Sequence, residues 1–139
     1  MAEHATFPVE VLTPDGEVFA DDVQMISTRT TIGSIGILAN HTPLLAMLDP
    51  TELRLYRSDS DVISFAQSEG YIQVGGNRAL LLVEEAHEPG ALDAAELRDR
   101  LQQAQHEIDE AGEDSERRRV AERDKRRWEA FLRIAEGGQ

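Results

Sequence analysis

The chain contains no cysteine and few aromatic residues, and it has no long apolar run. Without cysteine it can form neither a disulfide framework, nor a thiolate metal site, nor a thiol nucleophile. The longest apolar runs, Leu44–Leu48 and Ala79–Val83, are far shorter than the roughly 18 residues that a membrane-spanning helix needs. The N-terminal residues lack the basic and apolar segments of a secretory signal. We therefore expect a soluble cytosolic protein.

Basic residues are also scarce, because 14 Lys and Arg stand against 27 Asp and Glu in 139 residues, a net charge of −13. Nucleic acids and anionic membrane surfaces repel such a chain, so we expect no nucleic-acid partner and no direct insertion into lipid. The charge is uneven. Residues 1–88 carry 14 acidic and 4 basic side chains, whereas residues 115–133 carry 8 basic and 4 acidic ones. An acidic body thus precedes a segment with a locally basic end.

Short apolar segments separated by turn residues fill the first 88 positions. Thr13–Gly16 and Gly75–Asn77 are typical of tight turns, and no stretch keeps a helical period for three turns. This spacing predicts an antiparallel β-sandwich or barrel of seven or eight strands over residues 1–88. The expected strands lie at residues 7–11, 23–28, 32–38, 53–55, 62–66, 71–74 and 79–83.

The apolar period changes at Pro89-Gly90, and residues 89–139 are predicted to form an αα-hairpin. Asp93 is the expected N-terminal cap of the first helix, with Glu96 at its third helical position. Asp114 or Ser115 would cap the second helix. The first helix has a single apolar stripe, made of Leu97, Leu101, Ala104, Ile108 and Ala111. The whole chain is therefore mainly β with a helical appendage, and so polar a hairpin should detach easily from whatever it docks on.

No catalytic constellation is visible in the sequence. The histidines are scattered without the spacing of metal ligands, and the adjacent pairs Glu84-Glu85 and Asp21-Asp22 would point to opposite faces of a strand. We expect no catalytic residue, no metal site and no enzymatic activity of the chain on its own. A sandwich-fold hydrolase has only its fold class in its favour.

Arginines cluster in the second predicted helix at Arg117–Arg119 and Arg123–Arg127. A solvated helix face with Glu122 and Arg126 at i,i+4 spacing explains the pattern as well as a binding surface does. Nucleic acid is disfavoured, because no aromatic side chains for base stacking are interleaved and the rest of the chain is anionic. A basic helix face on an acidic protein fits an acidic protein surface better.

The most distinctive stretch runs from Gly33 to Leu44, where paired glycines precede Asn-His-Thr-Pro. It is interpreted either as hairpin architecture or as an exposed contact loop. With Val18-Phe19 before it, and Glu69–Val74 and Leu92–Glu96 after it, the ordered set resembles the epsilon chain of bacterial F-type ATP synthases. The resemblance covers almost the whole chain.

The resemblance implies a non-catalytic central-stalk subunit at the cytoplasmic face of the cell membrane. The sandwich would contact the gamma subunit and the c-ring, and would help couple proton flow to ATP synthesis. The hairpin would lie folded or extend into the alpha/beta catalytic head and restrain ATP hydrolysis. The implied c-ring contact loop comprises Gly33, Ser34, Ile35, Gly36, Asn40, His41 and Thr42. The implied inhibitory basic face comprises Arg119, Arg123, Arg126 and Arg127.

At two positions the sequence departs from the family pattern, and there the family's residue roles are less well supported. Ser34 stands where relatives often carry an acidic residue, so a charge pair with the c-ring is not expected there. The family pattern for ATP binding at the folded hairpin is matched by Glu84, Leu92 and Asp93, but Glu96 replaces its arginine. Since a carboxylate repels phosphate, we expect weak ATP binding at most, and no other cofactor.

One alternative remains open at this point. A free-standing β-sandwich could recognise a small ligand and dimerise through its helical tail. Co-purification with a gamma subunit or a c-ring discriminates between the two hypotheses.

Overall fold

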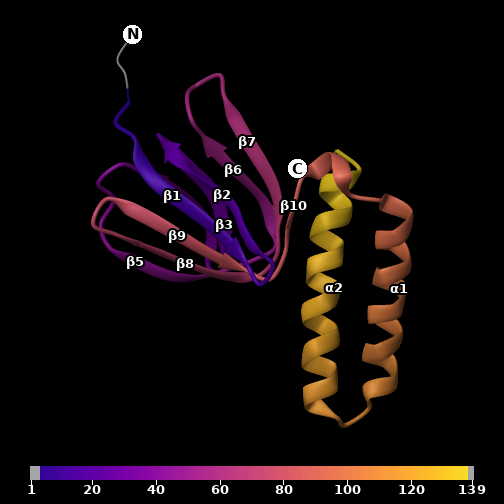
Figure 1. Cartoon of the computed structure of the whole chain (residues 1–139). Coiled ribbons are helices and arrows are strands. Elements are labelled where there is room, and N and C mark those ends of the chain that lie inside the picture. The colour runs from indigo at the N-terminus through magenta and orange to yellow at the C-terminus, as the bar shows by residue number, and fades with distance from the viewer. Residues whose placement is uncertain (1–3, 138–139) are drawn as a thin grey trace. The chain divides into compact units, whose positions relative to one another are not determined.

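The computed structural model describes residues 4–137, and the chain divides into two compact units between Glu88 and Pro89 (Figure 1). The first unit is a β-structure and the second is a helical hairpin. The predicted fold class, mainly β with a C-terminal helical pair, is confirmed. The strands are β1 (Phe7–Thr13), β2 (Gly16–Val23), β3 (Met25–Thr30), β4 (Gly33–Leu38), β5 (Leu44–Leu48), β6 (Thr51–Tyr56), β7 (Val62–Gln67), β8 (Gly70–Gly75), β9 (Arg78–Val83) and β10 (Ala86–His87).

The strands pair in the order β10-β7-β6-β3-β5-β8-β9-β1-β2, and β4 pairs with β3. A single residue pair, Thr30 with Leu48, joins β3 to β5. On one side of this narrow connection lies the β5-β8-β9-β1-β2 layer, and on the other side lies the β4-β3-β6-β7-β10 layer. The prediction of a purely antiparallel sheet was wrong in one place, because β1 and β9 run parallel. No hairpin joins these two strands, so chain connectivity does not dictate their direction.

Alternate residues of the strands form the core between the layers. Val9 and Val11 of β1 are buried, as are Leu81 of β9 and Leu53 of β6, while Glu10 between the two valines is exposed. This period of two is the pattern from which the strands were predicted. Burial of these side chains provides the main driving force for folding of the unit.

One polar network crosses the core. The Thr28 hydroxyl donates to Oε1 of Gln67 at 2.6 Å, and Nε2 of Gln67 donates to the carbonyl oxygen of Asp49 at 2.8 Å. Thr28 and Gln67 are both buried, so each needs a partner within the protein. In the described part of the chain, no buried side-chain nitrogen or oxygen lacks a hydrogen-bond partner.

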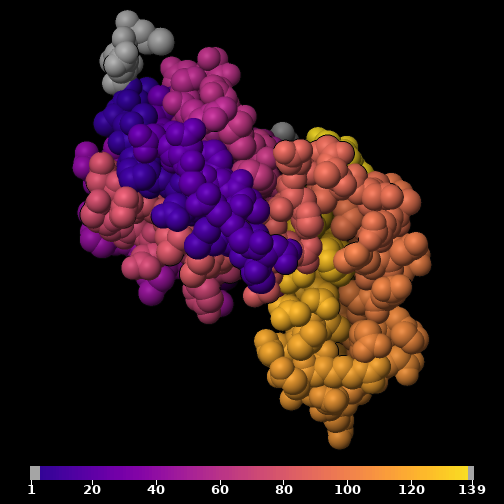
Figure 2. All heavy atoms as spheres, in the orientation of Figure 1, coloured from indigo at the N-terminus to yellow at the C-terminus, as the bar shows by residue number. Residues whose placement is uncertain are grey.

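The second unit contains a short 3-10 turn, η1 (Pro89–Ala91), followed by α1 (Ala94–Ala111) and α2 (Ser115–Ala135). The predicted cap is confirmed, because Oδ1 of Asp93 accepts from the amides of Ala95 and Glu96 at 3.0 and 3.2 Å. Asp114, one of the two alternatives, caps α2 by accepting from the amide of Arg117 at 3.0 Å. In the space-filling view the α1–α2 loop projects at one end of the hairpin (Figure 2).

Candidate functional site

The sequence predicted one contact loop from residues 33–36 and 40–42, and the structure separates these two groups. Residues 33–36 lie in β4, paired with residues 27–30 of β3. Asn40–Thr42 follow the other end of that strand. A strand of this length places its two ends about 20 Å apart. The named residues therefore do not form one continuous loop, because Gly33–Leu38 is a regular strand, as the sequence predicted over residues 32–38.

The β3–β4 turn exposes an isoleucine. The Thr30 hydroxyl accepts from the Ile32 amide at 3.2 Å and donates to the Gly33 carbonyl oxygen at 3.0 Å. Gly33 has a φ of 136°, which an L-residue rarely adopts, so glycine suits this position. Ile32 is 96% exposed at the tip, whereas Ile35 is half-buried against the core.

The other group lies beside the β8–β9 turn. The Asn40 amide donates to Oδ1 of Asn77 at 2.8 Å, and both asparagines have positive φ values, 63° and 57°. Nδ1 of His41 lies 2.6 Å from the carbonyl oxygen of Thr42. The bond between Asn40 and Asn77 links two turns at the same end of the sandwich, where the chain leads into β5.

The outer face of the β5-β8-β9 layer is apolar. Met47 of β5 pairs with Tyr71 of β8, which pairs with Leu82 of β9, so the three side chains form a row across the strands. Leu45 lies two residues before Met47 on the same face. Leu45 is 74% exposed, and Met47, Tyr71 and Leu82 are each about half exposed. We call these four residues the outer apolar face.

The predicted basic face lies only partly on the surface of α2. Arg119, Arg123 and Arg126 are exposed, and their spacing places them on one side of the helix. Arg127 is buried, with its guanidinium carbon 5.3 Å from the centre of the Trp128 ring. It belongs to the buried side of α2 because it precedes the buried Phe131 by one helical turn.

Acidic neighbours compensate part of the remaining basic charge. Arg119 donates to Glu116 at 2.6 Å, and Arg123 donates to Asp124 at 3.1 Å. The hydrogen bond from Arg119 lowers the pKa of Glu116 below its ordinary value. Two of the exposed arginines, Arg119 and Arg123, therefore have acidic partners on the same helix.

The three residues that matched the ATP-binding pattern have structural roles. The Glu84 amide donates to the Glu69 carbonyl oxygen at 3.3 Å, at the end of β9. Asp93 uses Oδ1 to cap α1, and Leu92 donates its amide to the Pro89 carbonyl oxygen at 3.3 Å. ATP binding by these residues stays a prediction.

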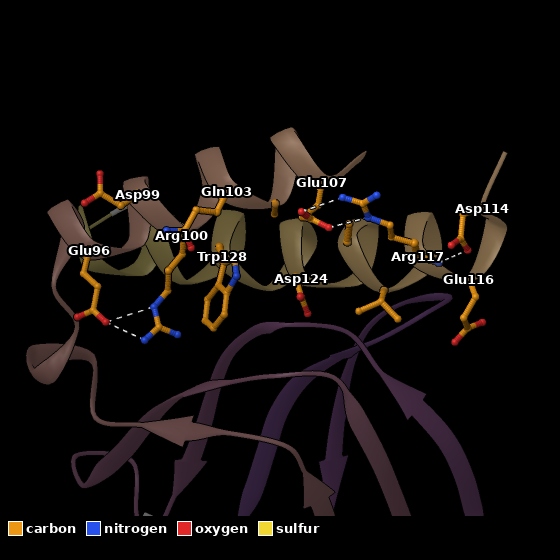
Figure 3. Close-up of a pocket in the computed structure, with 13 residues that line it drawn as sticks. Glu96, Asp99, Arg100, Gln103, Glu107, Asp114, Glu116, Arg117, Asp124 and Trp128 are labelled. Atoms are coloured by element: carbon orange, nitrogen blue, oxygen red, sulfur yellow. Dashed lines mark hydrogen bonds and ion pairs between the residues drawn. The ribbon is translucent and has the colours of Figure 1, made fainter. Parts of the chain in front are cut away.

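Both helices contribute side chains to a groove along the hairpin (Figure 3). Arg100 lies with its guanidinium carbon 4.9 Å from the centre of the Trp128 ring and donates to Glu96 at 2.7 Å. Near the loop, Arg117 donates to both carboxylate oxygens of Glu107 at 2.8 and 3.1 Å. This hydrogen bond lowers the pKa of Glu107 below its ordinary value.

Within residues 4–137, no three acidic or histidine side chains gather as a metal site. Neither helix of that part of the chain is long and apolar enough to span a membrane.

The sandwich matches a family model along nearly its whole length. Residues 6–89 match the model described as ATP synthase, Delta/Epsilon chain, beta-sandwich domain. The chain belongs to this family. The resemblance found in the sequence is thereby confirmed, and in this chain the family domain is followed by the helical pair.

Relatives that are named ATP synthase epsilon chains match this chain beyond the sandwich. The ATP synthase epsilon chain of Sulfurihydrogenibium sp. is 32% identical over 129 residues, which is 93% of this chain and 96% of the relative. The epsilon chain of Ligilactobacillus salivarius is 31% identical over 97% of this chain and 94% of the relative. The helical hairpin is therefore included in these matches.

Solved structures share the fold at low identity. A chain in the Euglena gracilis mitochondrial ATP synthase, in a structure of OSCP, F1 and c-ring, has a TM-score of 0.77 at 20% identity. That match covers 94% of this chain and 82% of the other. A chain from the Tetrahymena thermophila central stalk and c-ring has a TM-score of 0.60 at 17% identity, covering 96% and 99%.

Sequence reasoning missed two exposed apolar features of this epsilon-family chain, Ile32 and the outer apolar face. The signal for the face was present, because every residue of Leu44–Leu48 is apolar although a sheet strand with one solvated face alternates. No comparable signal marks Ile32, since a lone apolar residue beside a turn is common.

Proposed function

We propose that this chain is a non-catalytic subunit of the central stalk of an F-type ATP synthase, coupling proton flow to ATP synthesis. The sandwich contacts the gamma subunit and the c-ring, and the hairpin restrains ATP hydrolysis by reaching the alpha/beta head. The subunit is held peripherally at the cytoplasmic face of the membrane. The observation that carries the proposal is the family match over the sandwich, joined with a large apolar face that the sandwich leaves uncovered.

The outer apolar face is the proposed gamma contact. Soluble monomers rarely leave a contiguous group of large apolar side chains in water, and such groups mark interfaces. Leu45 and Tyr71 lie on rigid paired strands, so they can dock without ordering a loop. A stalk protein that must transmit rotation needs such a rigid contact.

The β3–β4 turn is the proposed c-ring contact. Ile32 protrudes at its tip, and Gly33 and Ser34 follow it at the start of β4. The absence of an acidic side chain at Ser34 makes this contact apolar instead of ionic. Asn40–Thr42 lie at the opposite end of β4, so they do not share this contact.

The exposed part of the basic face is the proposed inhibitory contact. Arg119, Arg123 and Arg126 can meet an acidic loop of the beta subunit when the hairpin extends. Arg119 and Arg123 are already paired with acidic residues of their own helix, so they would exchange partners on reaching the head. This exchange makes the restraint reversible, since an exposed ion pair contributes little free energy.

The first experiment is co-purification of the full chain with the gamma subunit and the c-ring. The double variant Leu45→Asp/Tyr71→Asp should lose gamma, because charges would be buried in the contact. Val62→Asp, an exposed position on β7, serves as the control and should retain gamma. If the native chain binds neither partner, the free-standing binding module replaces this proposal.

The second experiment removes residues 89–139 and measures ATP hydrolysis by the assembled enzyme. We expect hydrolysis to rise while coupling to proton flow is kept. The triple variant with glutamine at Arg119, Arg123 and Arg126 should raise hydrolysis as well, whereas Lys125→Gln on another side of α2 should not. Unchanged hydrolysis in the truncated enzyme would rule out the inhibitory role.

A further inference from the structure

Arginine side chains connect the two helical segments of the hairpin at three positions along its length. Near the loop, Arg117 of α2 forms a two-bond contact with Glu107 of α1. Further along, Arg100 of α1 stacks on Trp128 of α2, and at the open end Arg98 donates to Glu136 at 2.7 Å. These contacts differ from the pairs of Arg119 and Arg123, because their partners lie on different helical segments and must separate when the hairpin opens.

The residues near the loop stand at electrostatically unfavourable ends of their own helices. A helix has partial positive charge at its N-terminus and partial negative charge at its C-terminus. Arg117 lies in the first turn of α2, and Glu107 lies near the end of α1, whose last turn contains no basic residue. The closed hairpin offsets this, because Arg117 also reaches the Glu110 carbonyl oxygen at 3.4 Å and Arg118 donates to that of Gly112 at 3.1 Å.

Apolar packing supports these contacts unevenly along the hairpin. The buried Leu97 and Phe131 lie towards its open end, whereas the buried apolar side chains in the half nearer the loop are alanines, at positions 104, 111 and 121. An alanine methyl group removes far less apolar surface from water than a leucine or phenylalanine side chain does. Hairpin closure is therefore sensitive to the charged contacts that remain.

We infer that Arg117 with Glu107 and Arg100 with Trp128 form an interhelical clasp that sets how readily the hairpin opens. In the closed state the clasp keeps four side chains in contact across the two helices. Opening leaves Glu107 and Arg117 at the unfavourable ends of separate helices, which biases the equilibrium towards closure. The consequence for the enzyme rests on the proposed function, whereas the clasp itself is a property of the isolated chain.

Hydrogen exchange of the full isolated chain tests the clasp. Glu107→Gln should raise the exchange rates of the α1 and α2 amides about two- to five-fold, the range that exposed ion pairs support. Exchange in the sandwich should stay unchanged and provides an internal reference. The matched control is Arg119→Gln, which removes the contact between Arg119 and Glu116 within α2, lies outside the first helical turn and should leave hairpin exchange near the native rate.

A charge swap distinguishes the ion pair from other effects of the substitution. Glu107→Arg combined with Arg117→Glu rebuilds the pair with opposite polarity and places both charges at the favourable helix ends. We expect hairpin exchange to return to the native rate or below. Equal rates in Glu107→Gln and Arg119→Gln, or a swap as labile as the single variant, would overturn the clasp.

The second half of the clasp has its own probe, because Trp128 is the only tryptophan of the chain. Arg100→Gln should move its fluorescence emission to longer wavelength as water replaces the guanidinium, whereas Arg133→Gln should not. An unmoved emission would remove Arg100 from the clasp.

Measurements on the assembled enzyme test the clasp and the proposed function separately. If Glu107→Gln opens the isolated hairpin, hydrolysis should fall, because an open hairpin reaches the head more often. An open hairpin with unchanged hydrolysis would contradict the inhibitory function and leave the clasp intact. Unchanged exchange would contradict the clasp and leave the function intact.

Discussion

The sandwich and the hairpin are stabilised in different ways. The interior of the sandwich consists of large side chains such as Ile26, Leu53 and Leu81, each fully excluded from water. Among the described residues of the hairpin, the buried apolar side chains are four alanines with Leu97 and Phe131, and the arginine contacts are about half exposed to solvent. The first kind of contact keeps one structure over a wide range of conditions, because apolar burial is large and insensitive to pH. The second kind permits opening.

The largest expected effect comes from the sandwich core. Leu81→Ala should cost about 2–5 kcal/mol of unfolding free energy, since it leaves a cavity in a packed interior. The neighbouring Leu82 is 46% exposed, so Leu82→Ala should cost less than about 0.5 kcal/mol. Chemical denaturation measures both. Equal losses would show that the core is not the source of sandwich stability.

A substitution at Gly70 should also destabilise the sandwich, with a smaller loss of unfolding free energy than Leu81→Ala. A methyl group at this position would overlap the Leu82 carbonyl oxygen and lie 2.8 Å from the Val83 Cα, both backbone atoms. Gly70→Ala should cost about 1–3 kcal/mol, because the paired strand β9 must move. Gly36→Ala meets no atom within 4 Å and should be nearly neutral. A neutral Gly70→Ala would mean that β8 and β9 separate easily.

In the hairpin, the largest single local contribution is the cap of α1. Asp93→Ala removes the acceptor for the Ala95 and Glu96 amides and should cost about 1 kcal/mol of helix stability. Asp93→Asn keeps an acceptor and should retain most of it. Hydrogen exchange of α1 measures the loss, and the rates in β1 to β9 should not respond. A response of the sandwich would show that the two units unfold together.

Acid should loosen the hairpin before the sandwich, and this is the smallest expected effect. The hydrogen bond from Arg117 lowers the pKa of Glu107 in the folded chain, so the unfolded chain binds more protons at acid pH. The resulting stabilisation is complete above the ordinary glutamate pKa of about 4.3 and is lost as pH falls through the lower folded value. Melting of the helices, followed by circular dichroism, should shift downwards below that pH. The shift should shrink in Glu107→Gln and remain in the loop variant Glu113→Gln.

Local patterns were sufficient to predict most of the fold. Alternation of apolar and polar residues located strands such as β1, and Asp93 marked the start of α1 because a cap depends on neighbouring residues only. The parallel pairing of β1 with β9 could not be predicted, because it depends on which distant strands become neighbours in the folded sheet. The apolar run Leu44–Leu48, which forms β5, was not predicted as a strand, although the equally apolar Ala79–Val83 was.

The candidate surfaces were less predictable. Residues 33–42 were grouped because they are close in sequence, but a regular strand carries Gly33 and His41 to opposite ends of the sandwich. Arg127 follows Arg123 by four residues, so helical spacing alone places it beside the exposed arginines, and its burial depends on the packing of the two helices. The contact of Arg117 with Glu107 depends on how the loop aligns two helices, which no single helical pattern shows.

The parallel pairing of β1 with β9 also constrains how the chain folds during synthesis. Val9 emerges from the ribosome long before its partner Ala79, so the first strand must wait with its edge unpaired. Pairings between residues so distant in sequence are slow to form, whereas the hairpin consists of neighbouring contacts and can form within microseconds once its last turn is made. A nascent sandwich is consequently prone to aggregation until residue 83 has been added.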